Sequence, residues 1–317
     1  MNYLIVSQTS QRYIWELETL CYNLIVSRGI APERIVLLAY GEVSYFDQLV
    51  KTFKIQGYFY EDTRPSKWYA SSIRPWLIAQ YIQQECQGTT SFVYLDSDVI
   101  QLKEMDFSVY ESNEKVAYAS LTPYVSDDFL LSKRNGDVFL AALNELVPLT
   151  IEERQLVNTE LGGAQWILNQ VTSELFNEIY AVCETLYKKW FTLLYGQTWE
   201  GDNLIAEPDI WCTDMFVLQR LLVKSGYRIQ VLPEMSFVLP EQLIQEEDDY
   251  LFLHNAGIEP MKKPYHKYLF WKSAPSWRKM NPYDTDLSYV LDNRYSFIYI
   301  SEMQKIKQYK QYLISQD

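Results

Sequence analysis

The chain has 317 residues, of which 48% are hydrophobic and 22% are charged. This length and composition allow one large α/β domain or two small ones, and they exclude a disordered chain. The formal net charge of -13 argues against a nucleic-acid backbone or an anionic membrane surface as the main partner, because both attract basic surfaces.

The sequence also indicates where the protein works. No apolar run approaches the length of a membrane span, and the first residues lack the basic flank of a secretory signal. The four cysteines lie far apart, without the spacing of a metal site. We therefore expect reduced thiols in a cytoplasmic protein that has no transmembrane segment.

Strands and helices are expected to alternate over the first hundred residues. Short apolar runs predict the strands, and apolar residues at helical spacing predict the helices. The expected strands are 3–7, 34–40, 58–60 and a fourth that ends at Asp96, and the expected helices are 13–26, 45–53 and 74–86. This alternation predicts an α/β fold with parallel strands joined by right-handed crossovers.

The second half of the chain is expected to continue with both kinds of element. Strands are predicted at 116–120, 228–232 and 251–253, and helices at 137–147, 164–182, 211–224 and 303–314. The predicted helix 164–182 opens after Gly162 and Gly163. After Pro264 the sequence becomes rich in aromatic residues and lysines. We expect this end to be an extension packed on the main domain; the alternatives are an acceptor platform, a partner surface or a peripheral membrane contact.

Two acids follow the expected fourth strand. Asp96 and Asp98 are separated by Ser97, so at the end of a strand their side chains project to the same side. Two carboxylates held this close repel each other, and a hard divalent ion such as Mn²⁺ or Mg²⁺ would relieve the repulsion. In open α/β sheets ligands bind beyond the carboxyl ends of strands. The simpler interpretation is a pair of acids in a solvated turn.

Four stretches, in this order, resemble the glycogenin-like and lipopolysaccharide-galactosyltransferase-like family of retaining enzymes, which belong to the GT-A class of glycosyltransferases. Phe92–Ile100 is similar to the family's D-x-D strand, and Ile73–Ile82 to the helix whose first Arg lies beside the nucleotide sugar. Asp214–Gln219 resembles the D-Q-x-x-L-N helix start. His254–Gly257, followed by Lys263–Tyr265, resembles the H-x-x-G-x-x-K-P-W segment.

The resemblance implies a GT-A (Rossmann-like) fold, with a mostly parallel sheet flanked by helices. Residues 1–265 would form the nucleotide-sugar-binding catalytic domain and 266–317 the extension. Asp96, Asp98 and His254 would hold the metal, and a neutral imidazole suits Mn²⁺ better than Mg²⁺. Asp96 and Ser97 would also contact the donor.

The remaining site residues follow from the resemblance or from position. Arg74 and Lys263, or its competitor Lys262, would neutralise phosphate charge, and Gly257 belongs to the same segment. Asp214 would bind donor-sugar hydroxyls; otherwise it is a charge at a helix start. The other donor contacts expected are Gly162 and Gly163, with amides at a helix start, and Ser7, Gln8 and Asp62 at strand ends.

Two departures from the family pattern bear on activity. Met215 stands where the family has Gln beneath the reacting carbon, and Gln165 is the candidate to supply the missing amide. The gap between Gly257 and Lys263 is also longer than the family's. Met215 raises the alternative of a catalytically weakened scaffold or binding module. A haloacid-dehalogenase-type phosphatase is the enzyme rival, although Ile100 stands where that family has Thr or Val.

The sequence as a whole therefore favours a metal-dependent glycosyltransferase of the hexosyltransferase kind. It would move a sugar from a nucleotide-sugar donor, a UDP-sugar in the first place, with retention of anomeric configuration. The acceptor is left open between a glycan, a lipid-linked glycan, a protein and a small molecule.

Overall fold

The computed structural model describes residues 1–86, 88–195, 210–240, 242–255, 283 and 293–314. Gly257 and both Lys262 and Lys263 lie outside these residues, as does the expected domain boundary at 265. The chain forms two compact units. The N-terminal unit comprises residues 2–61, 95–106 and 234 onward, and the middle unit comprises 62–94 and 107–233.

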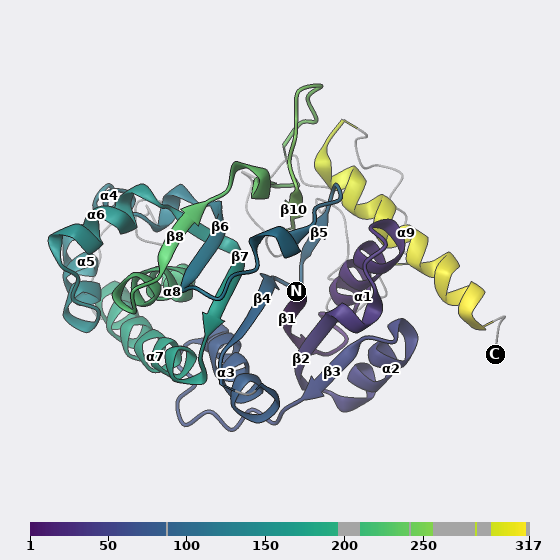
Figure 1. The fold of residues 1–317 in the computed structure, drawn as a ribbon, viewed down its shortest axis with the longest axis horizontal. Coiled ribbons are helices and arrows are strands. Elements are labelled where there is room, and N and C mark those ends of the chain that lie inside the picture. The colour runs from purple at the N-terminus through teal and green to yellow at the C-terminus, as the bar shows by residue number, and fades with distance from the viewer. Residues whose placement is uncertain (87, 196–209, 241, 256–282, 284–292, 315–317) are drawn as a thin grey trace. The chain divides into compact units, whose positions relative to one another are not determined.

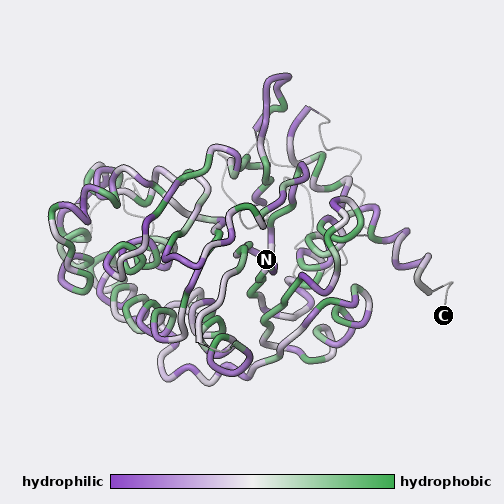
Figure 2. The backbone as a smooth tube through the Cα atoms, in the orientation of Figure 1, coloured by the Kyte–Doolittle hydropathy of each residue, from purple (hydrophilic) through white to green (hydrophobic). Residues whose placement is uncertain are grey.

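The N-terminal unit contains three parallel strands in the order β3-β2-β1. They are β1 (Asn2–Thr9), β2 (Ile35–Gly41) and β3 (Gln56–Phe59), and their connections carry helices α1 (Ile14–Tyr22) and α2 (Val43–Phe53). Ile35–Ala39 is fully buried, and β1 and β2 are hydrophobic along most of their length (Figure 2). Unbroken apolar runs of this kind are typical of parallel strands covered on both faces.

A second, smaller sheet of the N-terminal unit has the order β5-β10-β9. Its strands are β5 (Val99–Gln101), β10 (Phe252–His254) and β9 (Phe237–Val238). Ile100, Leu253 and Val238 pack with Trp15 of α1 and with helix α9 (Tyr295–Ile314), which lies beside α1 (Figure 1). Helix α9 begins eight residues before the predicted 303–314, because Tyr295, Tyr299 and Ile300 join this core.

The middle unit contains four strands in the order β4-β7-β6-β8. They are β4 (Thr90–Leu95), β7 (Gly162–Val171), β6 (Val116–Leu121) and β8 (Arg228–Val231); β7 runs antiparallel to β4 and β6. Six helices of this unit are α3 (Ile73–Glu85), α4 (Asp127–Leu131), α5 (Gly136–Leu146), α6 (Ile151–Thr159), α7 (Ser173–Tyr195) and α8 (Thr213–Lys224). Helix α7 packs against α3, α5 and α8.

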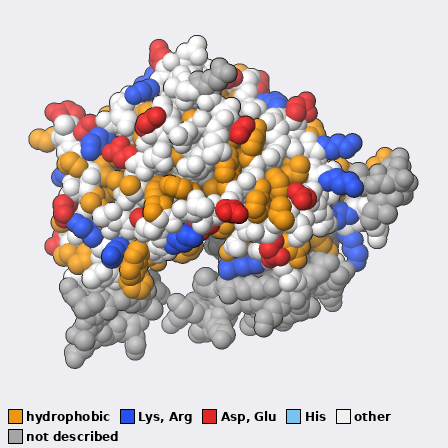
Figure 3. Space-filling view, turned by 90° about the horizontal axis from the view of Figure 1, so that it is seen from below, with side chains coloured by type: hydrophobic (Ala, Val, Ile, Leu, Met, Phe, Trp, Pro, Cys, Tyr) orange, Lys and Arg blue, Asp and Glu red, His pale blue; other side chains and the backbone are white. Residues whose placement is uncertain are grey.

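The expected fold class is confirmed. The structure is a mixed α/β fold whose central sheet has seven strands, mostly parallel and flanked by helices (Figure 1). Acidic and basic side chains are interspersed with apolar ones over the described part of the face in Figure 3. Within the described residues, the helices are too short or too polar to cross a lipid bilayer.

The predicted helix at 164–182 is wrong. Residues 162–171 form strand β7, and helix α7 begins only at Ser173, after Thr172, whose Oγ1 accepts a hydrogen bond from the Leu175 amide. The run Trp166–Leu168 lies in a central strand whose residues are buried on both faces, so its apolar residues do not alternate with polar ones. Gly162 and Gly163 therefore open a strand, and their amides are not at a helix start.

Candidate active site

The register of β5 against β10 brings together residues that are more than 150 positions apart in sequence. His254 pairs with Val99 in this antiparallel ladder, and the Asn255 amide donates to the Asp98 carbonyl oxygen at 2.9 Å. Val99, Ile100, Phe252 and Leu253 are fully buried, so this pairing is part of the core of the unit. His254 is thereby held beside the turn that carries Asp98.

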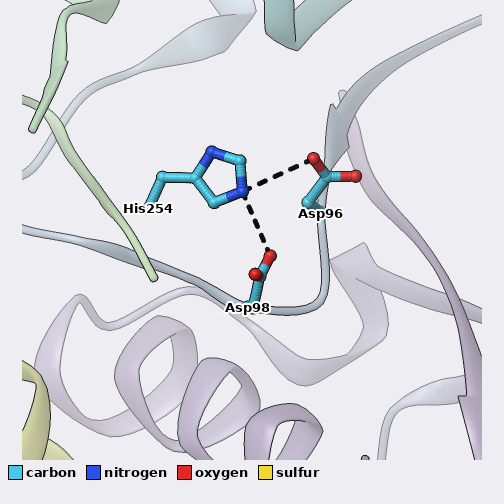
Figure 4. A group of neighbouring side chains, drawn as sticks. All are labelled: Asp96, Asp98 and His254. Carbon is cyan, nitrogen blue, oxygen red and sulfur yellow. Dashed lines mark ion pairs between the residues drawn. The ribbon is translucent and has the colours of Figure 1, made fainter. Parts of the chain in front are cut away.

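The three predicted metal ligands converge in the N-terminal unit (Figure 4). His254 Nε2 lies 3.3 Å from Asp98 Oδ1 and 3.8 Å from Asp96 Oδ2. One ligand atom from each residue lies within 4.8 Å of the others, and all three side chains are half-buried. Within the described residues, this is the one group of three or more acidic, His or Cys side chains with such spacing.

This donor set fits a divalent transition metal. Two carboxylate oxygens and one imidazole nitrogen are ligands that Mn²⁺ accepts, and the imidazole favours it over the harder Mg²⁺. The two carboxylates carry more negative charge than one imidazole can balance, even when it is protonated. A simple His–Asp ion pair is the alternative arrangement.

A second cluster, in the middle unit, surrounds Asp214 in the first turn of α8. Arg74, in the first turn of α3, places Nη1 3.2 Å from Asp214 Oδ2. The Tyr69 hydroxyl donates to Asp214 Oδ1 at 2.6 Å. The two carboxylate oxygens are therefore each engaged by a different side chain.

Gly162 and Gly163 are required by close packing. A methyl group on Gly163 would lie 2.8 Å from Cε of Met215 and 2.8 Å from Cβ of Thr122, and one on Gly162 would lie 2.7 Å from Cβ of Ala119. A larger side chain would have to displace Ala119 of β6 at Gly162, and Thr122 and the end of the Met215 side chain at Gly163. Met215 of α8 thus lies directly beside the stretch that carries Gln165.

Gln165 stands in a β-bulge. Ala119 pairs with Trp166 and Ser120 with Gly163, so Ala164 and Gln165 are extra residues in β7. Ala164 has a left-handed backbone conformation with φ of 58°, which is strained for a residue with a Cβ. Gln165 is fully buried, and neither end of its amide has a hydrogen-bond partner in the structure described. A buried amide of this kind marks a position where a polar ligand would be stabilised.

Comparison with solved structures finds glycosyltransferases. The chain is similar to the apo structure of the WbbM bifunctional glycosyltransferase, with a TM-score of 0.51 and 11% identity over 98% of this chain. The similarity covers 51% of WbbM, so this chain spans about half the length of that protein. The galactosyltransferase LgtC, in complex with donor and acceptor sugar analogues, gives a TM-score of 0.47 and 10% identity over 96% of both chains.

A scan against protein-family models gives no match, and no curated protein is similar by sequence. At 11% identity, the likeness to WbbM concerns the fold alone. The fold is that of the GT-A glycosyltransferases.

Within this GT-A fold, the other predicted donor contacts lie at strand ends. Ser7 and Gln8 occupy the carboxyl end of β1, where Ser7 is buried and Gln8 half-buried. Ser97 is half-buried in the turn between Asp96 and Asp98. Asp62, which follows β3, accepts two hydrogen bonds from the Arg64 guanidinium, at 2.9 Å from Nε and 3.0 Å from Nη2, and one from the Arg64 amide at 3.3 Å. These hydrogen bonds hold the pKa of the Asp62 carboxyl below its usual range.

Tyr69 and the segment around it were not predicted from the sequence. Residues 62–72 contain Arg64 and Tyr69, both buried, although the segment has neither helical nor alternating periodicity. The one signal in the sequence was that Arg64, Trp68 and Tyr69 occur together between a strand and the helix that carries Arg74. The local sequence does not show which acidic residue they contact.

Proposed function

We propose that the chain is a metal-dependent glycosyltransferase that moves a hexose from a nucleotide-sugar donor to an acceptor. UDP-sugars are the first candidates for the donor, with retention of configuration at the anomeric carbon. A glycan, a lipid-linked glycan, a protein or a small molecule remain the acceptor classes, in a cytoplasmic reaction.

The observation that carries this proposal is the convergence of Asp96, Asp98 and His254. The turn that carries Asp96 and Asp98 meets His254 of β10, distant in sequence, because β5 and β10 pair, and the result is an acid-rich ligand set beyond the carboxyl end of β4. In α/β folds this is where ligands bind. The GT-A fold supports the same conclusion at the level of architecture.

The roles of the residues follow from their chemistry. Asp96, Asp98 and His254 would hold Mn²⁺ or Mg²⁺, which supplies Lewis-acid stabilisation to the departing diphosphate when bound. Arg74 would add charge toward the phosphates through its planar fork, while Asp214 accepts hydrogen bonds from sugar hydroxyls. Gln165 would bind the sugar through its amide, and Gly162 and Gly163 would contact the donor through their backbone, by resemblance to the family.

Two further groups of residues belong to the proposal. Ser7, Gln8 and Asp62 would contact the base and ribose, together with Ser97. Gly257 and Lys263, or Lys262 in its place, would contact the diphosphate, by resemblance to the family segment that they follow.

Calorimetry with Mn²⁺ and a panel of UDP-, GDP- and CDP-sugars tests the proposal. The wild type is expected to bind one nucleotide class in a metal-dependent manner. Asp98→Asn is expected to weaken that binding by at least about tenfold, because removing a metal ligand should cost more affinity than removing a residue that only supports a ligand. Asp249→Asn is the matched control, because Asp249 is exposed and pairs with Lys103. Equal binding by wild type and Asp98→Asn would contradict the proposal.

Met215 favours a second candidate, a GT-A fold that binds a nucleotide sugar without turnover. Its thioether methyl lies against Gly163, and a thioether is a poor hydrogen-bond partner for a sugar. Slow hydrolysis of the donor without acceptor separates the two functions. Binding with no hydrolysis or transfer favours the scaffold, and NMR of a product gives its anomeric configuration.

A further inference from the structure

Within residues 62–72 of the middle unit, the buried side chain of Arg64 donates hydrogen bonds to several other residues of the same segment. Arg64 donates from Nη1 to the Tyr69 carbonyl oxygen at 3.1 Å, to the Ala70 carbonyl oxygen at 3.3 Å and to Ser72 Oγ at 2.8 Å. Its other nitrogens hold Asp62 at the start of the segment. One guanidinium thus ties both ends of the segment to a single point.

The negatively charged side chain of Glu184, in α7, also holds this segment through hydrogen bonds. Its carboxylate accepts hydrogen bonds from the amides of Trp68 at 2.8 Å and Tyr69 at 3.2 Å, and from the hydroxyls of Ser66 and Ser72. Burial raises the pKa of this carboxyl, but the four hydrogen bonds outweigh burial and leave the pKa below its usual range. The charged form of Glu184 is the form that holds the segment.

Tyr69 lies at the centre of this arrangement. Its ring is fully buried and stacks on Tyr187 with centroids 4.7 Å apart, so the ring has little freedom to rotate. Its hydroxyl lies within hydrogen-bond distance of Asp214 Oδ1 and the Trp211 carbonyl oxygen, and it accepts a long 3.4 Å bond from the Asp214 amide. Burial, and then the Asp214 charge, raise the pKa of the Tyr69 hydroxyl well above its usual value, so it remains a donor.

We propose that Tyr69 is a positioning residue that fixes the orientation of the Asp214 carboxylate. Tyr69 holds Oδ1 while Arg74 holds Oδ2, so rotation of the carboxylate breaks at least one charge-assisted hydrogen bond. Because Arg64 and Glu184 fasten the backbone on both sides of Tyr69, the hydroxyl cannot follow such a rotation. This inference rests on the proposed function, in which Asp214 contacts the donor sugar.

A double-mutant cycle on turnover tests the inference. Donor hydrolysis and transfer are measured for wild type, Tyr69→Phe, Asp214→Asn and the double variant. Tyr69→Phe is expected to lower kcat by roughly tenfold to a hundredfold, the cost of a misplaced group, with a much smaller change in KM for the donor. In the Asp214→Asn background the same change is expected to have almost no further effect, because its target is gone.

Tyr227→Phe is the matched control. Tyr227 is also a buried tyrosine of the middle unit, and its hydroxyl donates to the Gln170 carbonyl oxygen at 2.7 Å. It is expected to lower the melting temperature about as much as Tyr69→Phe and to leave kcat unchanged. Should Tyr69→Phe fail to fold, Glu184→Gln loosens the same segment and is expected to show the same non-additivity with Asp214→Asn, with a smaller fall in kcat.

Each result has one meaning. Wild-type kcat in Tyr69→Phe, or effects of the two substitutions that simply multiply, would overturn the positioning role alone. A wild type that neither hydrolyses nor transfers any donor sugar would overturn the proposed function instead.

Discussion

The two acidic clusters of this protein are built in different ways. Asp96, Asp98 and His254 are positioned by the register of two short strands, and their side chains are half-buried around an acid-rich centre. Asp214 is positioned by side chains, namely the guanidinium of Arg74 and the hydroxyl of Tyr69. Both clusters contain carboxylates, but one carries an excess of negative charge and the other contains its own cation.

This difference predicts different ligands. A cluster with two carboxylates and one imidazole gains most from an added cation, since the repulsion between its acids is not balanced within the three residues. An Asp–Arg pair is already balanced in charge, so it gains little from a metal and is better suited to neutral hydroxyl groups. The comparison therefore assigns the metal to the N-terminal unit and the sugar hydroxyls to the middle unit, as separate predictions.

Metal removal should have the largest effect. After treatment with a chelator, we expect transfer to fall by more than about a hundredfold, because a divalent ion contributes several kcal/mol of charge stabilisation in such reactions. Added Mn²⁺ should restore more activity than Mg²⁺, because of the imidazole ligand. Turnover at the original rate in excess chelator would contradict the assignment of a metal to the cluster of Asp96, Asp98 and His254.

Asp214→Asn should separate the two clusters. We expect turnover to fall by roughly a hundredfold, as when one well-aimed polar group is lost, while Mn²⁺ binding measured by calorimetry stays within about twofold of the wild type. In contrast, Asp98→Asn should lower the affinity for Mn²⁺. If Asp214→Asn abolishes metal binding, the assignment of separate roles is wrong.

Gln165→Met should make the protein more stable and less active. The buried amide has no partner in the described structure, so its replacement by an apolar side chain of similar shape is expected to raise the free energy of unfolding by about 1–3 kcal/mol. Donor affinity or turnover should fall.

The matched control for Gln165→Met is Gln219→Met. Gln219 is equally buried, but its Nε2 donates to the carbonyl oxygens of Val157, at 3.1 Å, and Glu160. Its replacement should lower the free energy of unfolding, as measured by urea denaturation. A destabilised Gln165→Met would show that the amide is already satisfied without a ligand.

Glu184→Gln should have the smallest effect, and it should depend on pH. Because the pKa of Glu184 is lower in the folded protein than in the unfolded chain, its charge stabilises the fold at neutral pH. That stabilisation is lost as the pH falls through and below about 4.3, the ordinary value for a glutamate. The wild type should therefore lose its advantage over Glu184→Gln on acidification.

Thermal unfolding between pH 7 and pH 3 measures this dependence. Glu145→Gln is the control, because Glu145 is exposed and pairs with Lys189 at the surface, where ion pairs contribute little. A constant difference in melting temperature between wild type and Glu184→Gln over this range would contradict the role of the charged form.

Strands that consist of an unbroken run of apolar residues between turn signals were predictable from the sequence. The buried run Ile35–Ala39 and the strand before Asp96 have the unbroken hydrophobicity of parallel strands, and both are strands. Of the predicted helix 164–182, only the part from Ser173 is helical, and the part before it was not predictable, because β7 is buried on both faces and so has no alternation. Its apolar residues fit a helix as well as a central strand until the neighbours are known.

The candidate site divides along the same line. The sequence by itself determined the spacing of Asp96 and Asp98, the apolar strand that leads to them and the order of the four stretches that resemble the family. Only the tertiary structure placed His254 beside Asp98, Tyr69 against Asp214 and Gln165 in a bulge next to Met215. The reason is physical: side-chain spacing along one strand follows from backbone geometry, whereas contacts between distant segments depend on strand register and packing, which no local pattern encodes.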